Sequence, residues 1–245
     1  MMFWTKSRRT LIVFCLVFLM GLFLSTLPMQ VVAQSSNLHV QGRSRISQSA
    51  TLLALDLKDE RRPLPGRREP AAGRGCGVDT PNPPLTALSP ATNLGFTVAA
   101  YPKFFFYIPQ MSAQALKFSL IKEDKDKVYE KTFAVPNTPG IFNLSLPADK
   151  TLPPLEVGKG YRWYFQIICS QQDSGDIYVD GWVQRVSGTG KNNLWYDTLA
   201  TLAQKRRLNA GDVVSAVKWA NLLRAEGLDK ITQEPLVGSL SGGEF

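Results

Sequence analysis

The residue types that carry out nucleophilic or metal-dependent chemistry are sparse in this 245-residue sequence. Its single histidine, His39, precedes every segment that has a clear strand or helix pattern. Ser-His-Asp triads, Cys-His pairs and the usual zinc sites all need a histidine, so the predicted folded part lacks them. The sequence also contains no P-loop, GxGxxG or HExxH pattern. We therefore expect a protein that is not an enzyme and has no cofactor, catalytic residue or metal site.

Carboxylate side chains could still bind a metal ion or catalyse hydrolysis. Asp173, Asp176 and Asp180 supply hard oxygen ligands of the kind that calcium prefers, but their spacing lacks the twelve-residue calcium-loop pattern. Such a cluster between two strands is more typical of a turn. A glycoside hydrolase pair would be drawn from Asp176, Asp180, Glu123 or Glu156. Because no pattern aligns two of them across a cleft, carboxylate hydrolysis is the second alternative to a binding function.

Segments that alternate apolar and polar residues fill the middle of the chain. They are LGFTVAA (94–100), ALKFSLI (115–121), VYEKTFAV (128–135), GIFNLSLP (140–147), YRWYFQIIC (161–169) and IYVDGWVQRV (177–186). Short polar turns between several of them predict hairpins. With the aromatic stretch at 101–110, about seven short strands predict a mostly β fold over 76–190. We expect an antiparallel β-sandwich of the immunoglobulin or fibronectin type III class.

The aromatic stretch YPKFFFYIPQ (101–110) has apolar residues at both alternating sets of positions. In a strand, Phe104 and Phe106 point to one side, and Phe105 and Tyr107 to the other. A stable fold would hide both sets, because each large buried side chain contributes about 1.5–3 kcal/mol. We therefore expect a central strand with the core on one side and the C-terminal helices near the other.

Two neighbouring predicted strands, 161–169 and 177–186, carry an outward-facing set of aromatic and polar residues. This candidate binding face consists of Arg162, Tyr164, Tyr178, Trp182 and Gln184. Aromatic residues mixed with Arg and Gln are typical of surfaces that bind protein or carbohydrate. The alternative is that the C-terminal helices cover this face, with Trp195 or Trp219 packed on it, because helices need an apolar surface.

The apolar period changes from two to between three and four after Gly190, which predicts a helical hairpin over 191–237. Asn193 and Asp212 are the predicted N-caps of its two helices, and Gly227 ends the second helix. We expect the hairpin to pack on the sandwich and residues 238–245 to form a flexible tail.

The N-terminal 33 residues have the pattern of a secretory signal peptide, with a basic start, the apolar run Leu11–Leu24 and cleavage near Ala33. An uncleaved anchor is the alternative. Cleavage removes three positive charges and lowers the formal charge from +8 to +5. Residues 34–75 form a basic, largely disordered linker, and the remainder is nearly neutral. We therefore expect a periplasmic or extracellular protein that binds no nucleic acid and contacts membrane only through the signal peptide or the basic linker.

Two cysteines, Cys76 and Cys169, remain after cleavage. A pair of cysteines in an exported protein predicts one disulfide. Two free thiols are the alternative.

Several blocks of the sequence together resemble a known family of exported bacterial proteins. They are GRGCG, LTALSP, YPKFFFYIP, FAVPNTPGIFNLSLP, LEVGKGYRWYFQIIC, GWVQRV and LWYDTLATLA, spread in this order between Gly73 and Val237. The chain resembles domain-of-unknown-function family 928, which is found mainly in oxygen-evolving photosynthetic bacteria. The resemblance implies export, a single domain type and a diderm envelope, but no activity, cofactor or functional residue.

These observations favour an exported, non-enzymatic binding or assembly module of the cell envelope. Its partner would be an envelope protein or polysaccharide, and recognition of envelope polysaccharide by the exposed Trp and Tyr side chains is the first alternative.

Overall fold

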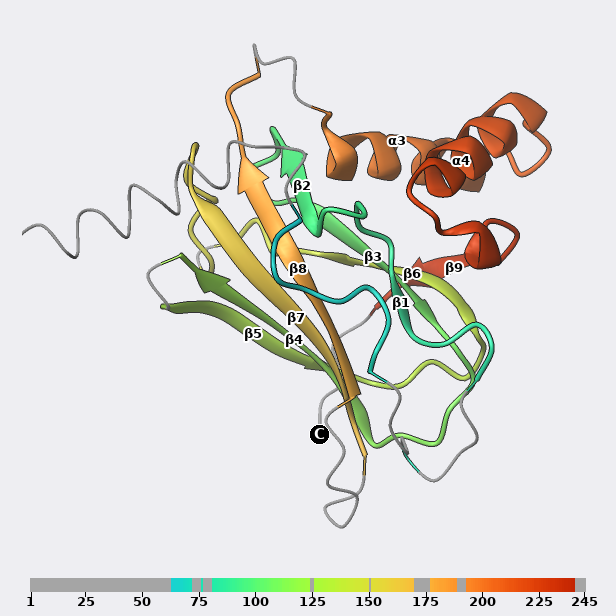
Figure 1. Cartoon of the computed structure of the whole chain (residues 1–245), viewed down its shortest axis with the longest axis horizontal. Helices are drawn as coiled ribbons and strands as arrows, with labels where there is room; N and C mark the ends of the chain where they lie inside the picture. Colours follow the sequence, from blue (N-terminus) through green and yellow to red (C-terminus); the bar gives the residue numbers. More distant parts are fainter. Residues whose placement is uncertain are drawn as a thin grey trace, which may run out of the picture. The chain divides into compact units, whose positions relative to one another are not determined.

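The computed structural model describes residues 63–71, 76, 81–123, 126–149, 151–169, 177–188 and 193–240. All of them belong to one compact unit, Gln48–Phe245. Within these residues the fold is mostly β, with one sheet of four strands, one of five, and two C-terminal helices (Figure 1). The predicted signal peptide, His39, Asp173 and Asp176 lie outside the described residues. No described helix is long and apolar enough to cross a membrane.

The four-stranded sheet has the order β1-β3-β6-β9. Its strands are β1 (Thr86–Ala87), β3 (Lys103–Ile108), β6 (Gly140–Ser145) and β9 (Leu236–Ser239). β3 pairs antiparallel with β1 and β6, whereas β9 runs parallel to β6. The strands predicted at β3 and β6 are confirmed. The sequence does not predict β9, because this strand has only four residues and lies across the expected boundary between hairpin and tail.

The five-stranded sheet has the order β2-β8-β7-β4-β5. Its strands are β2 (Leu94–Thr97), β4 (Ala115–Lys122), β5 (Lys127–Phe133), β7 (Gly160–Ile168) and β8 (Ile177–Arg185). All five are confirmed as predicted, and the pairs among β5, β4, β7 and β8 are antiparallel. The prediction that all strands pair antiparallel is wrong, because β2 is parallel to β8 and β9 is parallel to β6. Long crossovers, not hairpins, join the strands of these two parallel pairs.

The two sheets pack face to face around an aromatic core. The ring of Phe106 on β3 stacks on Phe165 of β7 at 4.0 Å, and Phe104 packs against Phe118 of β4 at 5.1 Å between ring centroids. The side chain of Phe105 points to the opposite side of β3, where its ring centroid lies 6.4 Å from that of Trp219. β3 lies between β1 and β6, so the prediction of a central strand with two buried sides is confirmed.

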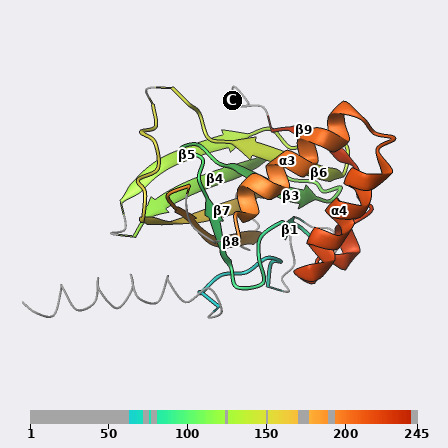
Figure 2. The same cartoon turned by 90° about the horizontal axis from the view of Figure 1, so that it is seen from above.

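The predicted helical hairpin is formed by α3 (Trp195–Leu208) and α4 (Val213–Ala225), which lie over the outer side of the four-stranded sheet (Figure 2). At the start of α3, Trp195 Nε1 donates a 2.9 Å hydrogen bond to the backbone oxygen of Leu88. The next residue, Tyr196, is buried, and its hydroxyl accepts a 2.9 Å bond from Trp163 Nε1. The 3-10 helix η1 (Asp229–Ile231) then leads to β9.

The ends of the two helices test the predicted caps. Asp212 caps α4 as predicted, since its side chain accepts from the backbone N–H groups of Val214 and Ser215. Gly227, with a φ of 72°, lies just beyond α4, where glycine adopts this left-handed conformation most easily. The cap predicted at Asn193 is wrong: the residue that precedes α3 is Leu194, and no side chain caps this helix.

Cys76 and Cys169 form a disulfide with a Cα–Cα distance of 5.1 Å. The bond joins the segment before β1 to the end of β7 and closes a loop of sequence separation 93. The predicted pairing is therefore confirmed.

A candidate binding surface on the five-stranded sheet

The outer face of the five-stranded sheet brings the five predicted binding residues together. In the antiparallel register of β7 and β8, Tyr164 lies opposite Asp180, and Arg162 lies opposite Trp182. Alternation along β8 puts Tyr178 and Gln184 on the same face. All five predicted side chains are half-buried. We call Arg162, Tyr164, Tyr178, Trp182 and Gln184 the aromatic–arginine face.

The C-terminal helices do not cover this face. Trp219 contacts Phe105 on the other sheet, and Trp195 bonds to Leu88. The alternative in which Trp195 or Trp219 packs on the aromatic–arginine face is therefore wrong. The physical reason is that β3 has two apolar sides, and the helices cover the side that faces away from the core.

A short N-terminal segment lies beside the face instead. Residues 63–71, which we call the strap, belong to the segment interpreted as linker. Arg67 forms an antiparallel bridge with Asp180, with backbone hydrogen bonds of 3.1 and 2.9 Å in the two directions. This bridge continues the sheet along the edge of β8, on the side of Leu94, where β2 begins opposite Trp182. The strap therefore borders the aromatic–arginine face on its β8 side.

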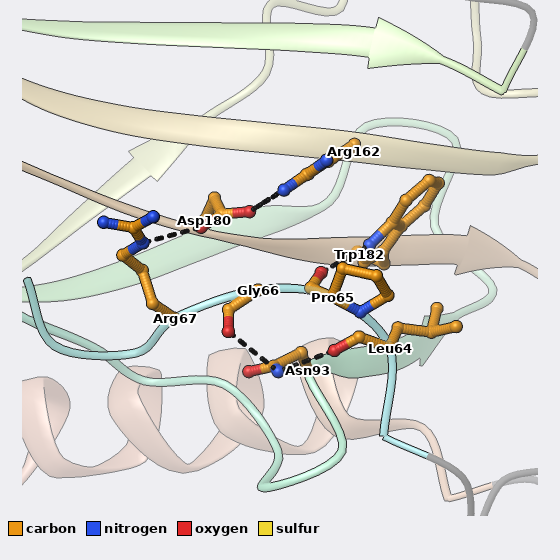
Figure 3. A network of polar contacts seen from close by, with 8 residues as sticks. All are labelled: Leu64, Pro65, Gly66, Arg67, Asn93, Arg162, Asp180 and Trp182. Atoms are coloured by element: carbon orange, nitrogen blue, oxygen red, sulfur yellow. Dashed lines mark hydrogen bonds and ion pairs between the residues drawn. The ribbon is translucent and has the colours of Figure 1, made fainter. Parts of the chain in front are cut away.

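Asp180 is the electrostatic centre of the surface. Its side chain is only 1% exposed, and its Oδ2 accepts from Arg162 Nε at 3.0 Å and Nη2 at 2.6 Å. Its Oδ1 lies 3.7 Å from Arg67 Nε in a second ion pair (Figure 3). Because a buried carboxylate is costly unless it is paired and hydrogen-bonded, Asp180 fixes both arginines to the sheet.

The two arginines in turn lie over the aromatic rings. The guanidinium carbon of Arg67 lies 4.1 Å from the ring centroid of Tyr178. That of Arg162 lies 4.9 Å from Tyr164 and 5.8 Å from Trp182. Cations at this distance from a ring face are attracted by its quadrupole. Charged and aromatic groups therefore alternate across the surface in a fixed arrangement.

Further hydrogen bonds hold the strap against the sheet. Trp182 Nε1 donates to the backbone oxygen of Pro65 at 3.0 Å (Figure 3). Asn93 Nδ2 donates to the backbone oxygens of Leu64 and Gly66 at 2.9 and 3.2 Å. A Cβ on Gly66 would lie 3.0 Å from the Asp180 backbone oxygen, which is tighter than almost all real contacts. The close approach of strap and strand therefore favours a glycine at this position, because any other residue would push the Asp180 backbone away.

The remaining predicted site residues lie apart from this cluster or at its edge. Gln184 donates from Nε2 to the backbone oxygen of Gly158 at 3.0 Å, at the end of the face. Glu156, a hydrolase candidate, is ion-paired with Lys122 at 2.7 Å. Burial raises the pKa of Tyr164, partly opposed by Arg162, so its hydroxyl stays protonated at neutral pH and can donate a hydrogen bond. No group of three or more His, Cys, Asp or Glu residues gathers within the described ranges.

Sequence reasoning misses Arg67 and the pairing role of Asp180. Alternation along β8 does place Asp180 between Tyr178 and Trp182 on the outward face, and this signal could have identified it. Arg67 carries no such signal, because the surrounding sequence is rich in Pro, Gly and Arg and has no strand period.

Two packed sheets, a C-terminal helical hairpin and one disulfide define a mostly β domain that presents an aromatic and basic surface. The model of the family described as Domain of Unknown Function (DUF928) matches residues 69–191 and 186–236. The chain therefore belongs to the DUF928 family, as the motifs predicted. A search of the curated proteins found no match to the chain.

Proposed function

We propose that this protein is an exported, non-enzymatic binding or assembly module of the cell envelope, and that the aromatic–arginine face binds its partner. The observation that carries the proposal is the set of Tyr, Trp and Arg side chains fixed by the buried Asp180. These three residue types dominate the binding energy of protein interfaces. Groups that are already held in place lose little conformational entropy on binding, which favours affinity.

The geometry favours a protein partner over a polysaccharide. Sugar rings stack on open aromatic faces, but guanidinium groups already lie over Tyr178 and Tyr164. A protein partner can instead extend the pattern by placing carboxylates on Arg67 and Arg162 and apolar groups on the ring edges. Recognition of envelope polysaccharide through Tyr164, Tyr178 and Trp182 is the second candidate, because these rings are half-exposed and neighbour the hydrogen-bonding Gln184.

Export to the periplasm or beyond is supported by the disulfide, because such bonds persist in oxidising compartments. Cleavage near Ala33 would release a mature chain that begins at Gln34. N-terminal sequencing of the protein purified from its native envelope tests this step. A first residue at Gln34 is expected, and an intact Met1 would contradict it.

For the fold, we propose an immunoglobulin- or fibronectin-like identity for the two packed sheets. The antiparallel pairs β4–β5 and β7–β8 and the shared aromatic core support this identity. The parallel strands β2 and β9 depart from the purely antiparallel type. An experimental structure whose strand connections match those domains would support the proposal, and a different connectivity would reject it.

Affinity capture from native envelope extract tests the binding function. The full chain is compared with the double variant Tyr164→Ala, Tyr178→Ala, and with Tyr101→Ala as a control that removes a half-buried ring elsewhere. A specific protein retained by the wild type and by the control, but lost with the double variant, is expected. Equal recovery by all three proteins, or hydrolase turnover that depends on Asp180, would overturn the proposal. A glycan titration that changes tryptophan fluorescence would favour the second candidate.

A further inference from the structure

A second surface lies at the tip of the α3–α4 hairpin, away from the aromatic–arginine face. Six large hydrophobic residues are exposed in the described part of the chain, and four of them lie at this tip. They are Leu208 at 80%, Val213 at 72%, Val214 at 62% and Val217 at 51% exposure. The hairpin turn projects away from the strands in Figure 1, where it is drawn in orange and red. We call residues 208–217 the hairpin tip.

The core does not account for these valines. The stripe of α4 that packs inward contains Ser215, Trp219, Ala220 and Leu223, all of which are buried. At 3.6 residues per turn, Val214 and Val217 lie outside this stripe. Val213 lies two turns before Ala220 at the edge of the stripe, and it is nevertheless 72% exposed because it begins the helix. Exposed apolar side chains that gather in one place mark an interaction surface more often than scattered ones do.

Basic residues surround the tip. Residues 204–218 contain four basic side chains and one acid, Asp212. The acid is engaged by its own helix, where it accepts from the N–H groups of Val214 and Ser215 at 3.0 and 3.2 Å. Lys205 and Lys218 are exposed and line the same groove of about 580 Å³ between the two helices.

We propose that the hairpin tip is a peripheral membrane contact: its four apolar side chains enter the interface of a bilayer, and Lys205 and Lys218 bind anionic lipid headgroups. Apolar residues bordered by lysines are the composition of surfaces that lie in such an interface. Each basic side chain near an anionic membrane strengthens binding about fivefold. This contact adds to those expected at the signal peptide or basic linker.

The charge of the tip argues against a second copy as its occupant. A symmetric dimer through the tip would bring Lys205 and Lys218 of two chains together, and such like-charge contacts are unfavourable. An anionic membrane removes this repulsion and also covers the valines. The aromatic–arginine face lies on the other sheet, so the membrane contact does not depend on the proposed binding function.

A fluorescent label at the tip tests the proposal in the full chain. The environment-sensitive dye NBD is attached to Ala210→Cys in a Cys15→Ser background, which leaves the Cys76–Cys169 disulfide as it is. The matched control carries the dye at Val157→Cys, an exposed valine in the connection before β7. Both proteins are mixed with phosphatidylcholine vesicles, with or without phosphatidylglycerol, and the dye is quenched with dithionite.

On vesicles that contain phosphatidylglycerol, the dye at position 210 should shift to the blue and be quenched at least about fivefold more slowly, whereas the dye at 157 stays accessible. Val214→Ser with Val217→Ser, or Lys205→Ser with Lys218→Ser, should abolish the protection. Equal quenching at 210 and 157 would overturn the proposal. Protection that rises with protein concentration in the absence of vesicles would also overturn it, in favour of self-association.

Discussion

Substitution of Asp180 by Asn removes the negative charge at the centre of the aromatic–arginine face while keeping the size of the side chain. The carboxylate accepts two hydrogen bonds from Arg162, at 3.0 and 2.6 Å, and pairs with Arg67 at 3.7 Å. An amide can present its oxygen to only one of these arginines and turns an N–H₂ group toward the other. The cost therefore comes from lost charge pairing and not from a cavity.

The expected size of the effect follows from burial. Hydrogen bonds to a charged group contribute about 1.5–3 kcal/mol each, and breaking a fully buried ion pair costs about 3–5 kcal/mol. The arginine side chains are 32% and 39% exposed, so water replaces part of the lost interaction. We expect Asp180→Asn to lower the free energy of unfolding by about 2–3 kcal/mol. For a domain of this size the melting temperature should fall by about 4–12 °C.

Urea unfolding followed by tryptophan fluorescence measures this change. The midpoint should decrease while the dependence on urea stays the same, because the exposed area changes little. Asp126→Asn, at an exposed carboxylate in the turn before β5, is the matched control and should leave the midpoint unchanged. If Asp180→Asn costs less than about 0.5 kcal/mol, the range of ordinary surface substitutions, then Asp180 does not fix the arginines as proposed.

Three further changes test other parts of the fold. Cys76→Ser should lower the free energy of unfolding by about 4 kcal/mol by opening a loop of separation 93, and denaturation with and without reductant should then give the same midpoint. Gly95→Ala should cost about 1–3 kcal/mol in the same assay because its Cβ would lie 2.5 Å from the ring of Tyr196. The control Gly188→Ala, whose Cβ would have no atom of the described residues within 4 Å, should be neutral. Tyr196→Phe should cost about 1–3 kcal/mol at neutral pH because Trp163 Nε1 loses its acceptor. Burial raises the Tyr196 pKa above its ordinary 10.0, so the stabilisation by its neutral hydroxyl is complete below pH 10 and falls as the pH rises further. Tyr196→Phe should therefore lose less stability than the wild type between neutral and alkaline pH. An identical alkaline profile of the two proteins would contradict this.

Strand alternation predicted much of the fold. The segments around β4 to β8 have a clear period of two, and each forms a strand close to its expected bounds. The sequence of the aromatic stretch was also enough to predict that β3 is buried on both sides. Both sides are apolar, and the five-stranded sheet covers one while α4 covers the other. Period-based reasoning works here because each strand must bury one face or both.

The parallel pairing of β2 with β8, the strand β9 and the position of the strap could not be derived in the same way. Their partners lie far away in the sequence, and pairing of such short segments depends on edges that exist only after the sheets have formed. The strap is held by backbone hydrogen bonds to Asp180 and by bonds from the side chains of Asn93 and Trp182 to its backbone oxygens. Backbone contacts of this kind leave no pattern in the side chains.

The candidate site, like the fold, was predicted only in part from the sequence. Alternation alone groups Tyr164, Tyr178 and Trp182 on one face, but it leaves open whether the helices cover that face. In the structure the helices pack on the four-stranded sheet, where Trp219 contacts Phe105, and leave the aromatic–arginine face uncovered. Arg67 arrives from a segment with no period, so the second cation of the Asp180 cluster became visible only in three dimensions.

The most direct measurement of the central claim is site-specific crosslinking in intact cells. A photoreactive phenylalanine analogue is placed at Tyr164 on the aromatic–arginine face, and at Lys103, an exposed residue on the four-stranded sheet, as the control. If the face binds an envelope protein, position 164 gives a discrete crosslinked species that is absent from position 103 and weakened by Asp180→Asn. The same species from both positions, or none from position 164, would contradict a binding role for this face.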